Sequence, residues 1–257
     1  MAENKNLQLE IKDHIALVTI DHPPANAWNL ATMQEFKTVI ESIAEDRNVR
    51  VLVLTGAGDK CFSAGFDVSD SENMATTSPM GRALWTKIDT LEKPTIAAIN
   101  GHALGGGLEL ALSCHFRLVA DKPGLKLGLT ELNLGIIPGW GGTQRITRLV
   151  GRDKALEMML LSQVLGPKEA LDAGIVNSLS PPDRLITDAL DLAAKLAERP
   201  PIAVSWVLKA MNAGNYYGMA EGLKVEDQGA AAVRITKDRE EGFKAFLEKR
   251  KPRFTGE

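Results

Sequence analysis

Four short runs of apolar, mostly β-branched residues, each bounded by turn-forming residues, divide the first half of the chain. Runs of this kind are typical of buried strands. They cover Ile15–Ile20, Val49–Leu54, Thr95–Ile99 and Phe116–Ala120. Between the first two runs, apolar side chains recur every three or four residues from Asn29 to Ala44, which indicates an amphipathic helix with Asn29 as its N-cap. Strands that alternate with helices predict an α/β fold.

The connections between these segments are irregular in length and rich in glycine. Eleven of the 23 glycines fall between Gly101 and Gly151. This punctuation favours a coiling stack of strand-strand-helix units over a doubly wound sheet. The sequence itself shows no fixed period, so the repeat is a prediction about structure.

The pattern changes after Pro167, where strand-like runs nearly vanish and helical stripes follow one another. Three apolar stripes recur here: Ile186, Ala189, Leu190, Ala193 and Leu196; Ile202–Met211; and Phe243, Phe246 and Leu247. We therefore expect an α/β core over residues 1–190 and a helical C-terminal region over residues 191–257. Helices that expose an apolar stripe need a partner surface, and another subunit is the expected partner.

The composition is that of an ordinary globular protein and argues against several partners. Lys and Arg total 30 against 33 Asp and Glu, so the net charge of −3 makes nucleic acid a poor partner. Two cysteines, Cys61 and Cys114, provide neither a disulfide framework nor zinc spacing, which suits a reducing compartment. Met1–Asp13 lacks the apolar segment of a secretory signal, and no apolar run approaches the roughly 18 residues of a membrane span. We expect a cytoplasmic protein with no membrane partner.

The segment N-G-H-A-L-G-G-G-L-E-L-A, residues 100–111, follows a strand and precedes good helix formers. Backbone N–H groups and the helix dipole favour negative charge at such a point. The spacing is neither G-x-G-x-x-G nor a P-loop, which leaves an oxyanion site. Glu109 stands three residues after Gly106, so its carboxylate can lie near the same cavity. The simpler alternative is that the glycines only permit close packing and Glu109 only complements the dipole.

Two further segments favour the functional interpretation. Residues 61–67, C-F-S-A-G-F-D, follow a predicted strand and can present a second backbone N–H beside the first. Residues 130–145 place another carboxylate, Glu131, before a glycine-rich loop 22 residues downstream of Glu109.

At A-G-F-D (64–67), N-G-H-A-L-G-G-G-L-E (100–109) and P-G-W-G-G-T-Q-R (138–145), in this order, the chain resembles the crotonase superfamily of enoyl-CoA hydratases and isomerases. The resemblance extends from about Ile15 to Phe254. It implies a crotonase-type spiral of strand-strand-helix repeats with a helical C-terminal trimerisation region. It also implies an acyl-CoA thioester as substrate, a homotrimer or hexamer as the assembly, and a place in fatty acid metabolism. No metal and no separate cofactor are expected, because coenzyme A is part of the substrate.

The resemblance assigns roles to individual residues. The backbone N–H groups of Phe66 and Gly106 would hold the thioester carbonyl, where negative charge develops as an enolate forms. Glu109 and Glu131 would be the acid/base pair that adds water across an α,β-double bond, with the division of labour between them open. Two carboxylates favour a hydratase, since an isomerase that shuttles one proton can work with one.

The same motifs imply a set of substrate contacts: Ala64, Gly65, Asp67, Gly139, Trp140 and Lys249. Of these, Ala64 and Gly65 would form the adenine-side wall. Lys249 would reach a phosphate, from a neighbouring subunit, although a basic cluster at a helix end also simply complements the dipole. Trp140 stands where the family often has a small residue, so it would either shorten the acyl pocket or belong to the core. Phe66 stands where the family often has a small residue, and Ser69 replaces the family's usual lysine, which would contact a phosphate.

Two alternatives accompany the hydratase interpretation. The nearer one is a double-bond isomerase or another enolate-forming enzyme on the same scaffold. The remote one is an RNA-binding member of the superfamily, which would need a lysine-rich early helix. Residues 33–46 hold one lysine and four acids, which argues against that role. His102, His115 and the two cysteines are interpreted as packing residues, and Met158 and Met159 as core filler.

Overall fold

A computed structural model describes residues 6–257; the first five residues of the segment Met1–Asp13 lie outside that range. The large sheet holds six strands in the order β1-β2-β3-β5-β7-β9, and a small sheet holds three in the order β4-β6-β8. The strands of the large sheet are β1 (Leu7–Lys12), β2 (Ile15–Ile20), β3 (Val51–Gly56), β5 (Thr95–Ile99), β7 (Phe116–Ala120) and β9 (Ser178–Ser180). Those of the small sheet are β4 (Cys61–Ser63), β6 (His102–Leu104) and β8 (Leu127–Gly128).

Helices follow the paired strands along the chain. They are α1 (Leu30–Glu45), α2 (Met74–Asp89), α3 (Gly106–Ser113), α4 (Gly142–Leu160), α5 (Pro167–Asp172), α6 (Leu185–Ala197), α7 (Pro201–Tyr217), α8 (Met219–Val233) and α9 (Lys237–Leu247). Two 3₁₀ helices cover Val68–Asn73 and Glu131–Leu134. In the described residues, no helix combines the length and the apolar character that a membrane crossing requires.

Three successive turns of the chain repeat one order: a strand of the large sheet, a strand of the small sheet, then a helix. The turns are β3-β4-α2, β5-β6-α3 and β7-β8-α4, and β2, β3, β5, β7 and β9 are parallel neighbours. This confirms the predicted spiral of strand-strand-helix units. Because β4, β6 and β8 are parallel, the segments that follow them emerge at one edge of the small sheet. All three predicted motifs lie in or after those segments.

The predicted strands are confirmed, and the mostly apolar runs become mostly buried strands. Three of them match residue for residue, and the run at Val49 begins its strand at Val51. Every residue of β3 and β5 is buried, as expected for parallel strands covered on both faces. The predicted cap of α1 is also confirmed: the Asn29 side chain accepts a hydrogen bond from the Thr32 N–H at 2.8 Å.

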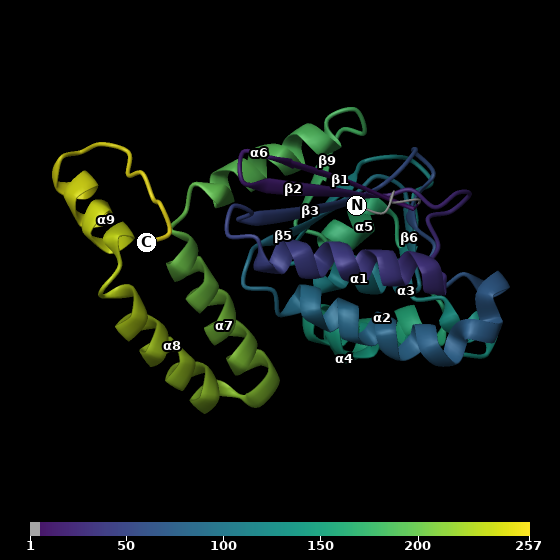
Figure 1. Cartoon of the computed structure of the whole chain (residues 1–257). Helices are drawn as coiled ribbons and strands as arrows, with labels where there is room; N and C mark the ends of the chain where they lie inside the picture. Colours follow the sequence, from purple (N-terminus) through teal and green to yellow (C-terminus); the bar gives the residue numbers. More distant parts are fainter. Residues whose placement is uncertain (1–5) are drawn as a thin grey trace.

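Helices cover both faces of the large sheet (Figure 1). The helices α1 to α4 lie on one side, whereas α6 contacts β2, β3, β5 and β7 on the other side. The pair α7 and α8 extends away from this body, and α9 lies beyond it. Helices α7 to α9 thus lie apart from the sheet, whereas α6, which spans the predicted boundary at residue 190, packs on it.

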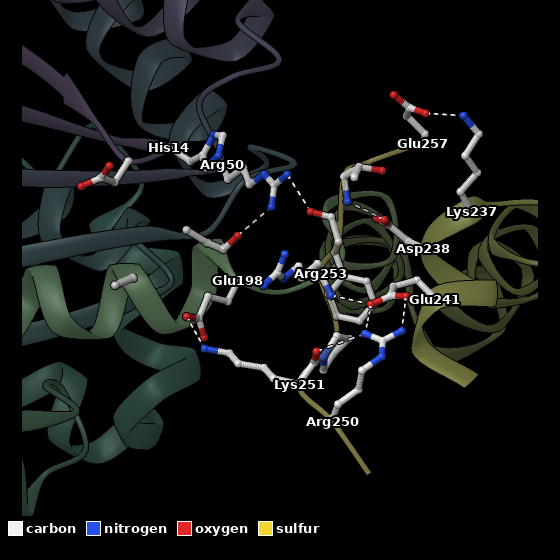
Figure 2. A pocket seen from close by; sticks show the side chains of 16 residues that line it. His14, Arg50, Glu198, Lys237, Asp238, Glu241, Arg250, Lys251, Arg253 and Glu257 are labelled. Atoms are coloured by element: carbon white, nitrogen blue, oxygen red, sulfur yellow. Dashed lines mark hydrogen bonds and ion pairs between the residues drawn. The ribbon is translucent and has the colours of Figure 1, made fainter. Parts of the chain in front are cut away.

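The C-terminal tail folds back between α9 and the sheet-bearing part of the chain (Figure 2). Arg50 donates to the backbone oxygens of Ala197 and Phe254, at 3.0 and 3.1 Å. Asp238, at the start of α9, accepts from the backbone N–H groups of Thr255 and Gly256, at 2.7 and 3.0 Å. These contacts attach the tail to the sheet-bearing part of the chain and to α9, and a charged cleft of about 1150 Å³ lies between them.

Candidate active site

A cavity of about 450 Å³ lies where the segments after β4, β6 and β8 meet. It is lined by Ala64, Phe66, Val68, Met74, Ser78, Arg82, Gly105, Gly106, Glu109, Thr130, Glu131, Leu134, Ile136, Ile137, Gly139 and Trp140. Most of its wall is apolar, and two carboxylates project from that wall. The fold thus brings the three predicted motifs to one cavity.

Two backbone amides from different motifs lie side by side at this cavity. Gly65 has φ +88°, and a Cβ at this position would lie 2.7 Å from the Gly106 nitrogen, so only glycine permits the approach. The Trp28 N–H donates to the Gly65 carbonyl, and the Asp67 N–H donates to the Trp28 carbonyl. Because both bonds are made by the neighbours of Phe66, the Phe66 N–H points away from Trp28. Gly106 is the first residue of α3 and has no intrahelical acceptor. Within residues 6–257, neither the Phe66 nor the Gly106 N–H donates to another group.

Glu109 is held rigidly at the cavity wall. Its side chain projects from the first turn of α3 and is only 1% exposed. The Oε1 atom accepts hydrogen bonds from the backbone N–H groups of Trp140 and Gly142, at 2.8 and 2.7 Å. Burial raises the pKa of this carboxyl, and the two N–H donors oppose that rise by favouring the charged form.

Glu131 presents its carboxylate to the same cavity without such support. It begins the short 3₁₀ helix after β8 and is 8% exposed. Both carboxylate oxygens are buried, and no group of residues 6–257 hydrogen-bonds to either. Burial, and secondarily the charge of Glu109, raise the pKa of Glu131 to about 7. The two carboxyls therefore differ: one is tied to fixed donors and the other is free to exchange a proton near neutral pH.

Trp140 belongs both to the core and to the cavity wall. Its indole packs edge-on against Trp85, with ring centroids 5.2 Å apart, and against Phe66 at 6.5 Å. A side chain at Gly106 would overlap the Trp140 ring, so this ring requires glycine in the amide-bearing turn. At 4% exposure Trp140 is a fixed aromatic wall. Trp140 therefore belongs to the core and also borders the cavity, and its effect on the acyl group stays a prediction.

The remaining predicted contacts are only partly gathered at the cavity. Ala64 and Gly139 line it, whereas Gly65 lies behind the wall against Gly106. Asp67 is turned to the following 3₁₀ helix, where its carboxylate accepts from the Ser69 N–H at 3.0 Å. Lys249 follows α9, which lies on the opposite side of the molecule from α2 (Figure 1). Lys249 does not line this cavity.

The residues set aside as packing groups are buried or bound within the fold. Cys61 and Cys114 are buried free thiols, and burial raises the pKa of Cys114 to about 12. The His115 ring is hydrogen-bonded to Thr95, and burial lowers its pKa to about 4. Met158 is fully buried, as predicted for core filler. Residues 6–257 contain no group of three or more His, Cys, Asp or Glu side chains arranged for a metal ion.

One wall of the cavity was not predicted from the sequence. Helix α2 contributes Met74, Ser78 and Arg82, and the Arg82 Nε donates to the Gly139 carbonyl at 3.1 Å. The spacing of Leu84, Trp85 and Ile88 was the available signal for a helix here. Pro79 and Gly81 interrupt the pattern and conceal it.

Paired carboxylates beside two free amides, carried on a strand-strand-helix spiral, define a crotonase-type enzyme. A family model described as "Enoyl-CoA hydratase/isomerase" matches residues 10–257. The chain belongs to this family, which confirms the resemblance seen in the motifs.

Individual relatives span nearly the whole chain. A "Probable enoyl-CoA hydratase" of Bacillus subtilis is 40% identical and covers 98% of this chain and 99% of the relative. A "Short-chain-enoyl-CoA hydratase" of Clostridium acetobutylicum is 38% identical, with 97% of both chains covered. Among solved structures, an enoyl-CoA hydratase from Bacillus anthracis superposes with a TM-score of 0.94 at 38% identity, over 98% of this chain and 100% of that one.

Proposed function

We propose that the chain is an enoyl-CoA hydratase, which adds water across the α,β-double bond of an enoyl-CoA thioester and catalyses the reverse dehydration. One observation carries the proposal: two buried carboxylates of different character, Glu109 and Glu131, share a cavity with two free backbone amides. Hydration needs one proton taken from water and one delivered to Cα, which is work for two such groups. The names of the relatives point to the same reaction.

The two carboxylates divide the proton transfers. The two N–H donors on Glu109 favour its carboxylate form against the effect of burial, which suits this group to accept the proton of the attacking water. Glu131, with a pKa of about 7, retains a proton near neutral pH and delivers it to Cα. After hydration the proton resides on Glu109, and the reverse reaction begins from that state.

The amides of Phe66 and Gly106 hold the thioester oxygen. Negative charge develops on this oxygen when water adds at Cβ, and fixed donors stabilise that charge more than they stabilise the neutral substrate. A donor of this kind typically contributes about 2.7–4 kcal/mol to the transition state. The start of α3 adds the positive end of a helix dipole.

The rest of the substrate extends from this centre. Ala64 and Gly139 line its path, Gly65 and Asp67 shape the loop that carries the Phe66 amide, and Trp140 limits the acyl group. Lys249 is assigned to a coenzyme A phosphate on a neighbouring subunit, since it lies away from the cavity of its own chain. No metal and no separate cofactor take part in this scheme.

Loss of the ultraviolet absorbance of crotonyl-CoA, and of longer or cyclic enoyl-CoAs, tests the proposal. The purified protein should bleach it, and Glu109→Gln and Glu131→Gln should each lower kcat by at least about 10²-fold. Circular dichroism and sedimentation of each variant control for misfolding. Product analysis separates the classes, because a water adduct supports the hydratase and a shifted alkene supports an isomerase. Absence of turnover with every thioester would overturn the proposal.

We further propose a homotrimer, alone or as a hexamer of two trimers, built on α7 to α9. In the isolated chain these helices and their connections expose a dense set of large apolar side chains: Val207, Met211, Tyr217, Met219, Leu223, Ile235, Phe243, Phe246 and Leu247. Monomers rarely expose so much apolar surface, and self-association would cover it. Sedimentation equilibrium at micromolar concentration should give three or six chains; a monomer would contradict the proposal. The buried free thiols Cys61 and Cys114 support a cytoplasmic, reducing location, which fractionation of cells can test.

A further inference from the structure

A chain of polar contacts begins at Asp89, the last residue of α2. The Asp89 carboxylate accepts from Arg145 Nε at 2.9 Å, with the two side chains only 20% and 11% exposed. An ion pair this sheltered is less screened than a surface pair, and the guanidinium has a fixed geometry. Asp89 and Arg145 therefore form a rigid link between α2 and α4.

The chain continues from Arg145 to Glu109 through the backbone of Trp140. Arg145 Nη1 donates to the Trp140 carbonyl at 2.9 Å, and the Trp140 N–H donates to Glu109 Oε1 at 2.8 Å. Both polar groups belong to one residue, so a shift of the guanidinium alters the placement of the N–H that faces Glu109. Arg145 does not line the cavity and does not hydrogen-bond to Glu109, but its charge and that of Arg82 favour the ionised form of Glu109.

At its other end the chain reaches α7, in the helical region outside the sheet-bearing part. Tyr216 hydrogen-bonds to the same Asp89 Oδ2 atom, and Asn212, one turn earlier, donates to the Asp89 carbonyl at 3.1 Å. Burial and Asp89 both raise the pKa of Tyr216, so its hydroxyl remains a donor over the working range of pH.

A second cluster holds α7 without entering this chain. Glu92 accepts from Ser205 at 2.8 Å and pairs with Lys209 at 2.9 Å. In the described part of the chain, no hydrogen bond or ion pair joins this cluster to Arg145 or to the glycine-rich loop. Variants in the two clusters can therefore distinguish a general loosening of α7 from a specific effect on the site.

We propose that Tyr216, Asp89 and Arg145 are positioning residues that fix the Trp140 amide on Glu109, so that the seating of α7 sets the activity of the site. The inference rests on the proposed hydratase function. It also makes activity depend on the helical region, because a displaced α7 releases Asp89 and Arg145.

Steady-state hydration of crotonyl-CoA by Tyr216→Phe and Lys209→Gln, both as the assembled protein, tests the proposal. Tyr216→Phe should lower kcat about two- to tenfold, with little change in KM. Displacement of the Trp140 N–H also weakens a contact that favours ionised Glu109, so the acid limb of the kcat profile should move to higher pH. Lys209→Gln removes a contact of α7 that lies outside this chain of contacts, and it should leave kcat and the pH profile at wild-type values.

Arg145→Lys keeps the charge but not the two-pronged contact, and serves as a second variant if Tyr216→Phe does not assemble. It should lower kcat by up to about 10²-fold, with the same shift of the acid limb. The proposal is overturned if both variants keep the wild-type kcat and pH profile, or if Lys209→Gln has the same effect as Tyr216→Phe. Inactivity of the wild-type protein would instead contradict the proposed function.

Discussion

The carboxylate of Glu131 lies against the backbone of Gly105, with Oε1 3.1 Å from the position that a Cβ at residue 105 would occupy. The next two glycines have still closer and different neighbours: the Cβ position of Gly106 faces the Trp140 ring, and that of Gly107 faces the Ser63 backbone oxygen. The glycine run is thus the point where the three motifs pack on one another. It places the second carboxylate as well as the first.

Close packing around Glu131 makes protein stability depend on pH. Its folded-state pKa of about 7 lies above the ordinary value of 4.5, so the folded form binds the proton more tightly than the unfolded chain. The resulting stabilisation is complete below pH 4.5 and is lost as pH rises through about 7. Relative to Glu131→Gln, the wild type should lose about 3 kcal/mol of unfolding free energy between pH 4.5 and 8.

Urea unfolding of both proteins at matched concentration, at pH 5 and pH 8, measures this difference. Glu131→Gln should be the more stable protein at pH 8 while remaining nearly inactive. A variant of the exposed Glu72, Glu72→Gln, controls for the loss of one acid from the chain. A stability difference that stays constant across this range would contradict the buried, unpaired state of Glu131.

The same group sets the alkaline limb of activity. The carboxyl pair Glu109 and Glu131 holds one proton before either reaction starts. That proton lies on Glu131 before hydration and on Glu109 before dehydration. Loss of that proton as pH rises above about 7 should lower kcat/KM tenfold per pH unit for both directions alike. Initial rates with crotonyl-CoA and with its hydrated product, in buffers of constant ionic strength, test this. Opposite pH dependences for the two directions would be incompatible with a shared proton.

The sequence allowed prediction of the parts of the site that short motifs encode. The resemblance of three short motifs to the crotonase superfamily predicts that Phe66, Gly106, Glu109 and Glu131 share one site, and all four line one cavity. The four main strands were equally clear, because their burial on both faces requires continuous apolar runs.

Features that depend on distant neighbours could not be predicted. Strands β4, β6 and β8 have two or three residues each, too few for any periodicity. The direction of Trp140 depends on its contacts with Trp85 and Gly106, which come from other turns of the spiral. The role of Arg145 depends on Asp89, 56 residues earlier, and no local pattern encodes such a pair.

Gly65→Ala tests the oxyanion site through geometry alone. A Cβ at residue 65 would meet the Gly106 nitrogen at 2.7 Å and the Leu104 oxygen at 2.9 Å, so the two amides must separate. We expect kcat/KM to fall at least about 10²-fold. The positive φ adds a conformational cost of about 1–3 kcal/mol.

Gly58→Ala is the matched control for that substitution. Gly58 has φ +74°, so alanine there carries a similar conformational cost, but no atom lies within 4 Å of its Cβ position. This variant should lose stability and keep its kcat/KM for crotonyl-CoA. Equal losses of activity in both variants would show that strain, and not the spacing of the amides, limits the reaction.

Trp140→Leu should change which acyl groups the enzyme accepts. The indole is a fixed wall of a cavity of about 450 Å³, and its removal leaves room beside Phe66 for a longer or cyclic acyl group. The ratio of kcat/KM for a bulky enoyl-CoA to that for crotonyl-CoA should rise at least about tenfold. Trp28→Leu removes an indole from the same aromatic cluster without opening the cavity, since Trp28 packs on Trp85 and does not line it. That variant should lose stability by up to about 3 kcal/mol and leave the ratio unchanged. If the ratio stays constant in Trp140→Leu, or rises as much in Trp28→Leu, Trp140 does not limit the acyl group.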